Sequence, residues 1–211
     1  MMLDTLLAVL IITSFLLVVA KRVSALINYF TIQSLALCLL ILLLAYTGHN
    51  VELYIVAGLI FLVKVILIPY YLSKIVRKIK VDENVGLFIN PAVSVFVAIG
   101  LVYLSYLFTK KLHIAEALEQ GAFTIAISTI FIGMLLMIAR TKALVQIIGL
   151  LVMENGLFLA GTSAAGGMPF FFEVAVFFDI FVSVVILQLF IYRINNVFTH
   201  IDTNKLKELK G

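Results

Sequence analysis

The chain consists largely of apolar runs that are long enough to cross a lipid bilayer, and this feature restricts its fold most. A helix needs about 20 apolar residues to span a hydrocarbon core of about 30 Å. Seven such runs follow one another: Leu3 to Ala20, Ser24 to Tyr46, Val51 to Leu72, Phe88 to Phe108, Gly121 to Ala139, Ala143 to Ala164 and Phe170 to Tyr192. They lack the strict alternation of barrel strands, so the sequence predicts an all-α polytopic membrane protein with about seven transmembrane helices.

The overall composition supports the same class. Of the 211 residues, 64% are hydrophobic and 12% are charged, and the mean hydropathy is +1.22. A water-soluble domain of this size does not need so much apolar surface to fill one core. The leading residues Met1-Met2-Leu3-Asp4 carry no positive charge, and Lys21-Arg22 follow the first run, which favours a retained spanning helix over a cleaved signal peptide.

Basic residues gather on one side of the predicted membrane. With seven spans, one side carries only Lys110 and Lys111, and the other carries Lys21, Arg22, Lys74, Arg77, Lys78, Lys80, Arg140, Lys142, Arg193, Lys205, Lys207 and Lys210. Loops rich in lysine and arginine stay in the cytoplasm, so we expect the N-terminus outside and the C-terminus in the cytoplasm. These charges serve topology and contact with the bilayer, and we expect no nucleic-acid partner.

Residues that could hold a cofactor are scarce. Cys38 is the only cysteine and lies within a span, while His49 and His113 fall in outer loops and His200 in the tail. This excludes a disulfide framework, an iron–sulfur ligand set and a pair of histidines for haem. No GxxxxGK[ST] loop is present. We therefore expect no catalytic residue, no metal and no cofactor in this chain.

Two pairs of segments suggest an internal repeat. The stretch "GLIFLVKVILIPYYL" from Gly58 aligns with "FDIFVSVVILQLFIY" from Phe178 at an offset of 120 residues, and "RVSALIN" from Arg22 aligns with "RTKALVQ" from Arg140 at an offset of 118. The sequence thus predicts two parallel three-helix units. They would comprise residues 1–80 and 117–211, joined by residues 81–116 with the fourth helix.

The second unit carries the resemblance to a known family. "ARTKALVQIIGLLVMENGLFLAG", from Ala139 to Gly161, looks like the second helix of the three-helix K subunit of complex I, with its basic start, I-G-L step and acidic residue. The next span, in "FFEVAVFFDIFVSVVILQLFIYR", also has an acidic residue near mid-membrane. With its length and helix number, the chain resembles the hydrogenase-4 component E family.

This resemblance implies a function and a set of partners. It implies a multi-pass subunit of a prokaryotic plasma membrane complex, an energy-converting hydrogenase of the formate hydrogenlyase type that is related to complex I. Such a subunit would help to couple redox chemistry in other subunits to the movement of protons or sodium ions. Its partners would be antiporter-like and quinone-site-like membrane chains.

Glu154 and Asp179 stand out because they are acidic residues inside apolar spans. A carboxylate persists at such depth only if it is protonated, paired or exposed to a hydrated interior. Glu154, with Asn155 beside it, is interpreted either as part of an ion or proton pathway or as a hydrogen-bonding contact to a neighbouring subunit. Aligning the I-G-L steps puts the family's acidic position on Leu151, and three residues turn a helix by about 300°, so Glu154 stays close to that face.

The first unit lacks these acids but carries Lys64 within the third span. Lys64 lies about 12 Å from the predicted cytoplasmic end of its span, which exceeds the reach of about 6 Å of its side chain. It is interpreted as a residue of the pathway or an ion partner of an acid on another chain, with snorkelling as the alternative. Gln33 and Gln188 could line a water chain, and Pro69 is expected to kink the helix after Lys64.

Two other functions remain open at the level of sequence. Multisubunit cation/proton antiporters also contain a small K-like chain, so the protein could belong to such a complex. It could also be a structural scaffold whose neighbours conduct the ions. Substitution of Glu154 and Asp179 would distinguish a scaffold from a pathway.

Overall fold

The structure is a computed structural model that describes residues 2–49, 51–78, 85–86, 89–112 and 117–164. Its helices are α1 (Met2–Val19), α2 (Val23–Gly48), α3 (Val51–Ile60), the π-helical segment η1 (Phe61–Leu67), α4 (Ile68–Lys78), α5 (Pro91–Lys111), α6 (Ala117–Ala139) and α7 (Ala143–Ala164). Six helices among the described residues are long and apolar enough to span a membrane, with α3, η1 and α4 forming one of them. The predicted all-α polytopic membrane fold is confirmed. The predicted seventh span, with Glu173, Asp179 and Gln188, lies outside the described residues.

Most predicted spans agree with the helices to within a few residues, and the exceptions have local causes. The third span continues to Lys78 instead of ending at Leu72, because its last turns present basic residues that water or headgroups can solvate. The fourth helix begins at Pro91, where the Asn90 side chain accepts a hydrogen bond from the Ala92 N–H over 3.1 Å. Proline is favoured at a first helical position because its missing N–H is not needed there.

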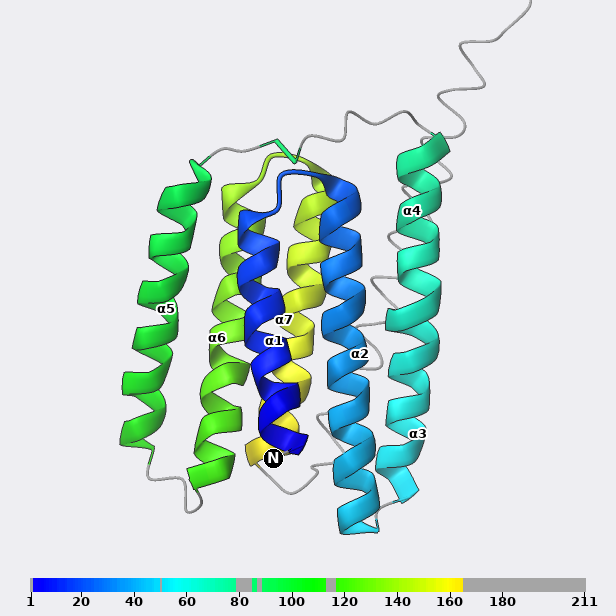
Figure 1. The fold of residues 1–211 in the computed structure, drawn as a ribbon, viewed down its shortest axis with the longest axis vertical. Helices are drawn as coiled ribbons and strands as arrows, with labels where there is room; N and C mark the ends of the chain where they lie inside the picture. The colour runs from blue at the N-terminus through cyan, green and yellow to red at the C-terminus, as the bar shows by residue number, and fades with distance from the viewer. Residues whose placement is uncertain (1, 50, 79–84, 87–88, 113–116, 165–211) are drawn as a thin grey trace, which may run out of the picture.

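The six spans form a bundle in which α1, α2, α6 and α7 are central (Figure 1). Helices α6 and α7 have the most extensive contact with each other, and α1 and α2 pack against them. Helix α5 lies on one flank beside α6, and the rod formed by α3, η1 and α4 lies on the other flank beside α2. This order places the rod that carries Lys64 against α2.

Glycines allow α6 and α7 to approach each other closely. A Cβ atom at Gly133 would lie 2.5 Å from the backbone nitrogen of Met153, and one at Gly156 would lie 2.8 Å from the carbonyl oxygen of Ala126. Gly149 meets the backbone of α6 in the same way. The hydrophobic effect does not drive helix association in lipid, so the association depends on van der Waals packing. Small residues at a crossing strengthen this packing because they let the two backbones approach closely. The close contact fixes where α7 presents its side chains.

The connections at the basic end of the bundle are joined by hydrogen bonds. The buried Arg140 donates from Nη2 to the carbonyl oxygen of Val18 over 2.6 Å, at the C-terminal turn of α1. Burial lowers the pKa of the Arg140 guanidinium, although arginine keeps its charge at neutral pH. The Thr141 N–H donates to the Gly86 carbonyl oxygen over 3.0 Å. A cation near the last carbonyls of α1 is favourable because they carry the negative end of the helix dipole.

The direction of the helices supplies a test of the predicted orientation. Helix α5 begins, and α6 and α7 are joined, at one end of the bundle, whereas α2 and α5 end at the other (Figure 1). Asn90→Cys and Thr141→Cys should not react with a membrane-impermeant maleimide in intact cells, and they should react once the cells are opened. Gly48→Cys and Leu112→Cys should react with the same maleimide in intact cells. The wild-type chain, whose single Cys38 is buried, supplies the background. Labelling of Asn90→Cys and Gly48→Cys from the same side would contradict the bundle.

Candidate functional site

Lys64 and Glu154 form an ion pair in the interior of the bundle. Lys64 Nζ lies 3.3 Å from Glu154 Oε2, and the two side chains are 0% and 1% exposed. Lys64 belongs to η1 near the middle of its span, and Glu154 lies near the middle of α7. The Lys64 side chain therefore does not extend to the helix end, and both charges lie at membrane depth.

The π-helical segment η1 directs Lys64 into the bundle. Among its seven residues Lys64 is the buried one, whereas Phe61, Leu62 and Ile66 are exposed on the outer surface. The segment ends where the N–H of Ile68 donates to the carbonyl oxygen of Val63, five residues earlier. The disturbance expected at Pro69 thus includes a π-helical widening of the turns before it, because the ring of Pro69 has no N–H to continue the α-helical pattern.

Asn155 connects the ion pair to α2. Lys64 Nζ donates to Asn155 Oδ1 over 3.2 Å, and Asn155 Nδ2 donates to Ser34 Oγ over 3.1 Å and to Gln33 Oε1 over 3.5 Å. The contact to Gln33 is long for a hydrogen bond and is the weaker of the two. Asn155 thus uses both ends of its amide between η1 and α2.

Gln33 extends the same network to α1. Its Nε2 donates to Ser14 Oγ over 2.8 Å, and the Ser14 hydroxyl donates to the carbonyl oxygen of Leu10 over 2.8 Å. Gln33, Ser14 and Ser34 are all fully buried. The polar groups therefore form a continuous chain that crosses the bundle from η1 through α7 and α2 to α1.

An aromatic ring also lies beside the ion pair. The ring of Phe158, one turn along α7 from Glu154, has its centroid 4.6 Å from Lys64 Nζ. The ring face attracts a cation by electrostatics. Leu151, the position that the K-subunit pattern gives to an acid, is fully buried like Glu154, so both positions face the interior of the bundle.

This arrangement can respond to a change of charge. Two unit charges 3.3 Å apart attract each other by about 5 kcal/mol at an effective dielectric constant of about 20. The cost of removing both groups from water offsets much of this attraction. A proton that is added to Glu154 or removed from Lys64 abolishes this attraction, because one of the two charges is lost. The pair is thus chemically suited to coupling a proton at one position to a charge nearby.

Four of the candidate residues come together in the structure: Lys64, Glu154, Asn155 and Gln33. The other two, Asp179 and Gln188, lie outside the described residues. Sequence reasoning missed Ser14, Ser34 and Phe158, because serine and phenylalanine are common in spanning helices and neither stands out in an apolar run. The acid that faces Lys64 belongs to the same chain, whereas the sequence suggested one on another chain.

Metal ligands do not gather in the part of the chain that the structure describes. No group of three or more histidine, cysteine, aspartate or glutamate residues lies close enough there to hold a metal ion. Cys38 is buried, and its thiol lies 3.4 Å from the carbonyl oxygen of Ala57, to which it donates a hydrogen bond. The buried polar network is therefore the best candidate for a functional site among these residues.

Comparison with known proteins places the chain beside a small group of relatives. No protein-family model matches it, and no solved structure matches it. An uncharacterized protein of Mycobacterium tuberculosis is 22% identical over 203 residues, which cover 95% of this chain and 92% of the relative. Hydrogenase-4 component E of Escherichia coli K12 is 25% identical over 213 residues, which cover 100% of this chain and 98% of the relative. The component E of Shigella flexneri gives the same values.

These comparisons do not test the likeness of the C-terminal unit to the K subunit of complex I, which stays a prediction. They do extend the similarity beyond the C-terminal motif to the first three spans and the joining helix. The predicted resemblance is confirmed: the chain is a relative of hydrogenase-4 component E along its whole length.

Proposed function

We propose that the chain is a membrane subunit of a multisubunit energy-converting hydrogenase of the hydrogenase-4 or formate hydrogenlyase type. Its buried network forms part of the pathway that couples redox chemistry in other subunits to proton or sodium movement. The full-length similarity to hydrogenase-4 component E supports the assignment to such a complex. The observation that carries the role in coupling is the fully buried ion pair of Lys64 and Glu154.

The geometry supports a relay that runs across the bundle. A proton that reaches Glu154 neutralises the carboxylate and removes its attraction for the Lys64 ammonium, which still donates to the oxygen of Asn155. The ammonium is less favourable without this attraction, which promotes the loss of a proton from Lys64, so the two events are linked. The chain of hydrogen bonds from Asn155 through Gln33 to Ser14 lies at mid-membrane depth. Proton paths to either surface would then pass through neighbouring subunits or the following span with Asp179.

Isolation of the complex tests the assignment to a hydrogenase. The chain, tagged at its C-terminus and purified in mild detergent, should bring with it a nickel–iron hydrogenase subunit and large antiporter-like membrane chains. The rival, a cation/proton antiporter complex, predicts antiporter-like chains without any hydrogenase subunit. Only a complex that contains a nickel–iron hydrogenase subunit agrees with the proposal.

The Glu154→Gln substitution tests the relay. Glutamine keeps the shape of the side chain and can accept a hydrogen bond from Lys64, but it cannot exchange a proton. In proteoliposomes we expect ion pumping per hydrogen produced to fall about tenfold or more, since a group that transfers protons contributes factors of this size or larger. Glu154→Asp should retain part of the pumping.

The matched control is Glu52→Gln, which makes the same chemical change on an exposed glutamate in the first turn of α3. It should leave pumping per turnover unchanged. The structural alternative predicts that Glu154→Gln and Glu154→Leu both reduce the amount of assembled complex, because each removes the carboxylate that faces Lys64. The complex that does assemble would then pump at the wild-type ratio. A fully assembled and fully coupled Glu154→Gln complex would exclude the relay.

A further inference from the structure

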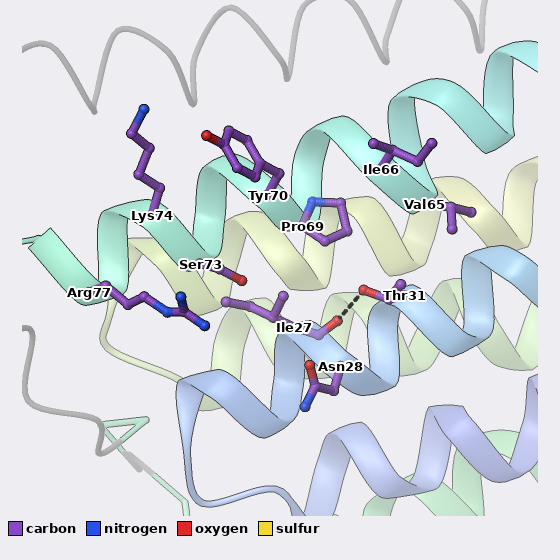
Figure 2. Close-up of a pocket in the computed structure, with 10 residues that line it drawn as sticks. All are labelled: Ile27, Asn28, Thr31, Val65, Ile66, Pro69, Tyr70, Ser73, Lys74 and Arg77. Atoms are coloured by element: carbon purple, nitrogen blue, oxygen red, sulfur yellow. Dashed lines mark hydrogen bonds between the residues drawn. The ribbon is translucent and has the colours of Figure 1, made fainter.

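A groove between α2 and the rod of η1 and α4 is separate from the buried network. It has a volume of about 760 Å³ and opens on the outer surface of the bundle. Figure 2 shows its two walls: Ile27, Asn28 and Thr31 from α2 lie opposite residues of η1 and α4. The groove lies toward the end of the bundle where α2 begins and α4 ends.

The chemical character of the groove changes along its length. Its inner part is lined by Val65, Ile66 and Pro69, near mid-membrane. The part nearer the helix ends is lined by Lys74 and Arg77, which lie in the last two turns of α4. In Figure 2 the Arg77 side chain extends toward α2, and Lys74 lies on the outer side next to Tyr70, whose ring centroid is 5.6 Å from Lys74 Nζ. The groove thus has an apolar end and a cationic end.

Polar groups accompany the two cations. Asn28 and Ser73 line the groove from its two walls, while Thr31 donates its hydroxyl hydrogen to the carbonyl oxygen of Ile27 over 2.8 Å. Among the described residues that line the groove, none is acidic. The cationic end is therefore suited to an anion that can also accept hydrogen bonds.

We propose that this groove binds an anionic phospholipid, with its phosphate-containing headgroup at Lys74 and Arg77 and an acyl chain along Val65 and Ile66. Arg77 follows Ile66 by eleven positions, which is about 16 Å along a helix and close to the roughly 15 Å of hydrocarbon in one leaflet. By the predicted orientation, the cations lie at the level of the cytoplasmic headgroups. Basic pockets between helices on that side are typical sites for anionic lipids.

The bound lipid has a structural consequence. Val65 and Ile66 follow Lys64 directly in η1, and they face the groove while Lys64 faces the interior. An acyl chain in the groove packs against the outside of the π-helical segment. Lipid binding should therefore stabilise the helix that carries Lys64.

Lipid titration of the purified full-length chain tests the site. The chain is prepared in a neutral detergent, and bound lipid is counted by native mass spectrometry as phosphatidylglycerol or phosphatidylcholine is added. We expect the wild-type chain to bind phosphatidylglycerol at least about fivefold more tightly. The double variant Lys74→Gln/Arg77→Gln should weaken phosphatidylglycerol binding about tenfold or more and leave phosphatidylcholine binding nearly unchanged.

Two further variants separate the groove from general surface charge. Lys21→Gln/Arg22→Gln removes the same charge at the same end of the bundle from exposed positions that do not line the groove, and it should retain the lipid preference. Asn28→Trp fills the groove without changing its charge and should weaken binding of phosphatidylglycerol. Glycerol phosphate, which has the headgroup anion without acyl chains, should not compete.

Three outcomes would overturn the proposal. One is equal affinity of the wild-type chain for the two lipids. Another is equal loss of phosphatidylglycerol binding in the two double variants, which would indicate a diffuse surface effect. The third is a groove that is closed to lipid because a helix of a partner or of this chain occupies it. In that case Ser73→Cys would resist alkylation by a lipid-soluble maleimide in the intact complex, whatever lipid is added.

Discussion

Replacing Lys64 with methionine is expected to destabilise the folded chain strongly. Methionine fills a similar volume but leaves the Glu154 carboxylate without the ammonium that lies 3.3 Å from it. Breaking a buried ion pair by removing one partner typically costs about 3–5 kcal/mol, and neutralising a glutamic acid at pH 7 instead costs about 4 kcal/mol. A loss of about 3 kcal/mol corresponds to a fall of roughly 6–12 °C in Tm for a chain of this size.

The double variant Lys64→Met/Glu154→Met is compared with Lys64→Met in the same experiment. It removes both charges, and replacement of a buried ion pair by apolar residues of similar volume is often neutral for stability. We therefore expect it to recover most of the Tm that Lys64→Met loses, while pumping per turnover stays low. The measurements are thermal unfolding of the purified chain in detergent and pumping by the assembled complex.

The result separates the two roles of the ion pair. A purely structural pair predicts that the double variant regains pumping along with stability. A relay predicts that stability returns without pumping. Lys64→Met with unchanged Tm would contradict the ion pair itself.

Gly133→Ala is expected to disrupt the central helix pair. The added Cβ would lie 2.5 Å from the nitrogen and 2.8 Å from the Cα of Met153, and 2.7 Å from the carbonyl oxygen of Gly149. All three are backbone atoms of α7, so no side-chain rotation relieves the contact and the helices have to separate. Overpacking of this kind typically costs about 1–3 kcal/mol and occasionally more, and rigid backbone contacts favour the upper part of that range.

The same substitution should also affect the ion pair, because Met153 precedes Glu154 in α7. A shift of this turn away from α6 changes the distance between Glu154 and Lys64, so pumping should fall together with Tm. Gly100→Ala is the matched control, since nothing lies within 4 Å of a Cβ at Gly100 in α5. Alanine is a better helix former than glycine by up to about 1 kcal/mol, so this control should be neutral or stabilising. Equal Tm values for the two variants would contradict the close approach of α6 and α7.

Some features of the site follow from residue type and depth alone. Lys64 and Glu154 attract notice in the sequence because a charge in an apolar span has to be compensated. Their pairing does not follow, since they lie in different predicted units. A partner on another chain was one of the interpretations that the sequence left open for each residue, and the structure instead brings the two together within one chain. Ser14 and Ser34 could not be selected at all, because a serine in a span can satisfy its hydroxyl on its own helix.

The sequence also predicts only part of the structure around η1. Pro69 predicts a local distortion of its helix, because any proline in a helix interior removes a backbone hydrogen bond. Whether the helix kinks or widens depends on how the preceding turn packs against its neighbours. The structure has a π-helical segment with Lys64 as its buried residue, and this choice places the ammonium toward α7. The division of the chain at residues 80 and 117 stays a prediction.

The sequence by itself determined the class of fold and the positions of most spans. Long apolar runs must be helices in lipid because each backbone polar group needs a partner within its own segment. Which face of each helix points inward was decided only by the tertiary structure. In a membrane, lipid-facing and core-facing positions are both apolar, so hydrophobicity does not distinguish them. That choice came instead from close helix contacts, such as those at Gly133 and Gly156, and from the need of Lys64, Glu154, Asn155 and Gln33 to satisfy one another.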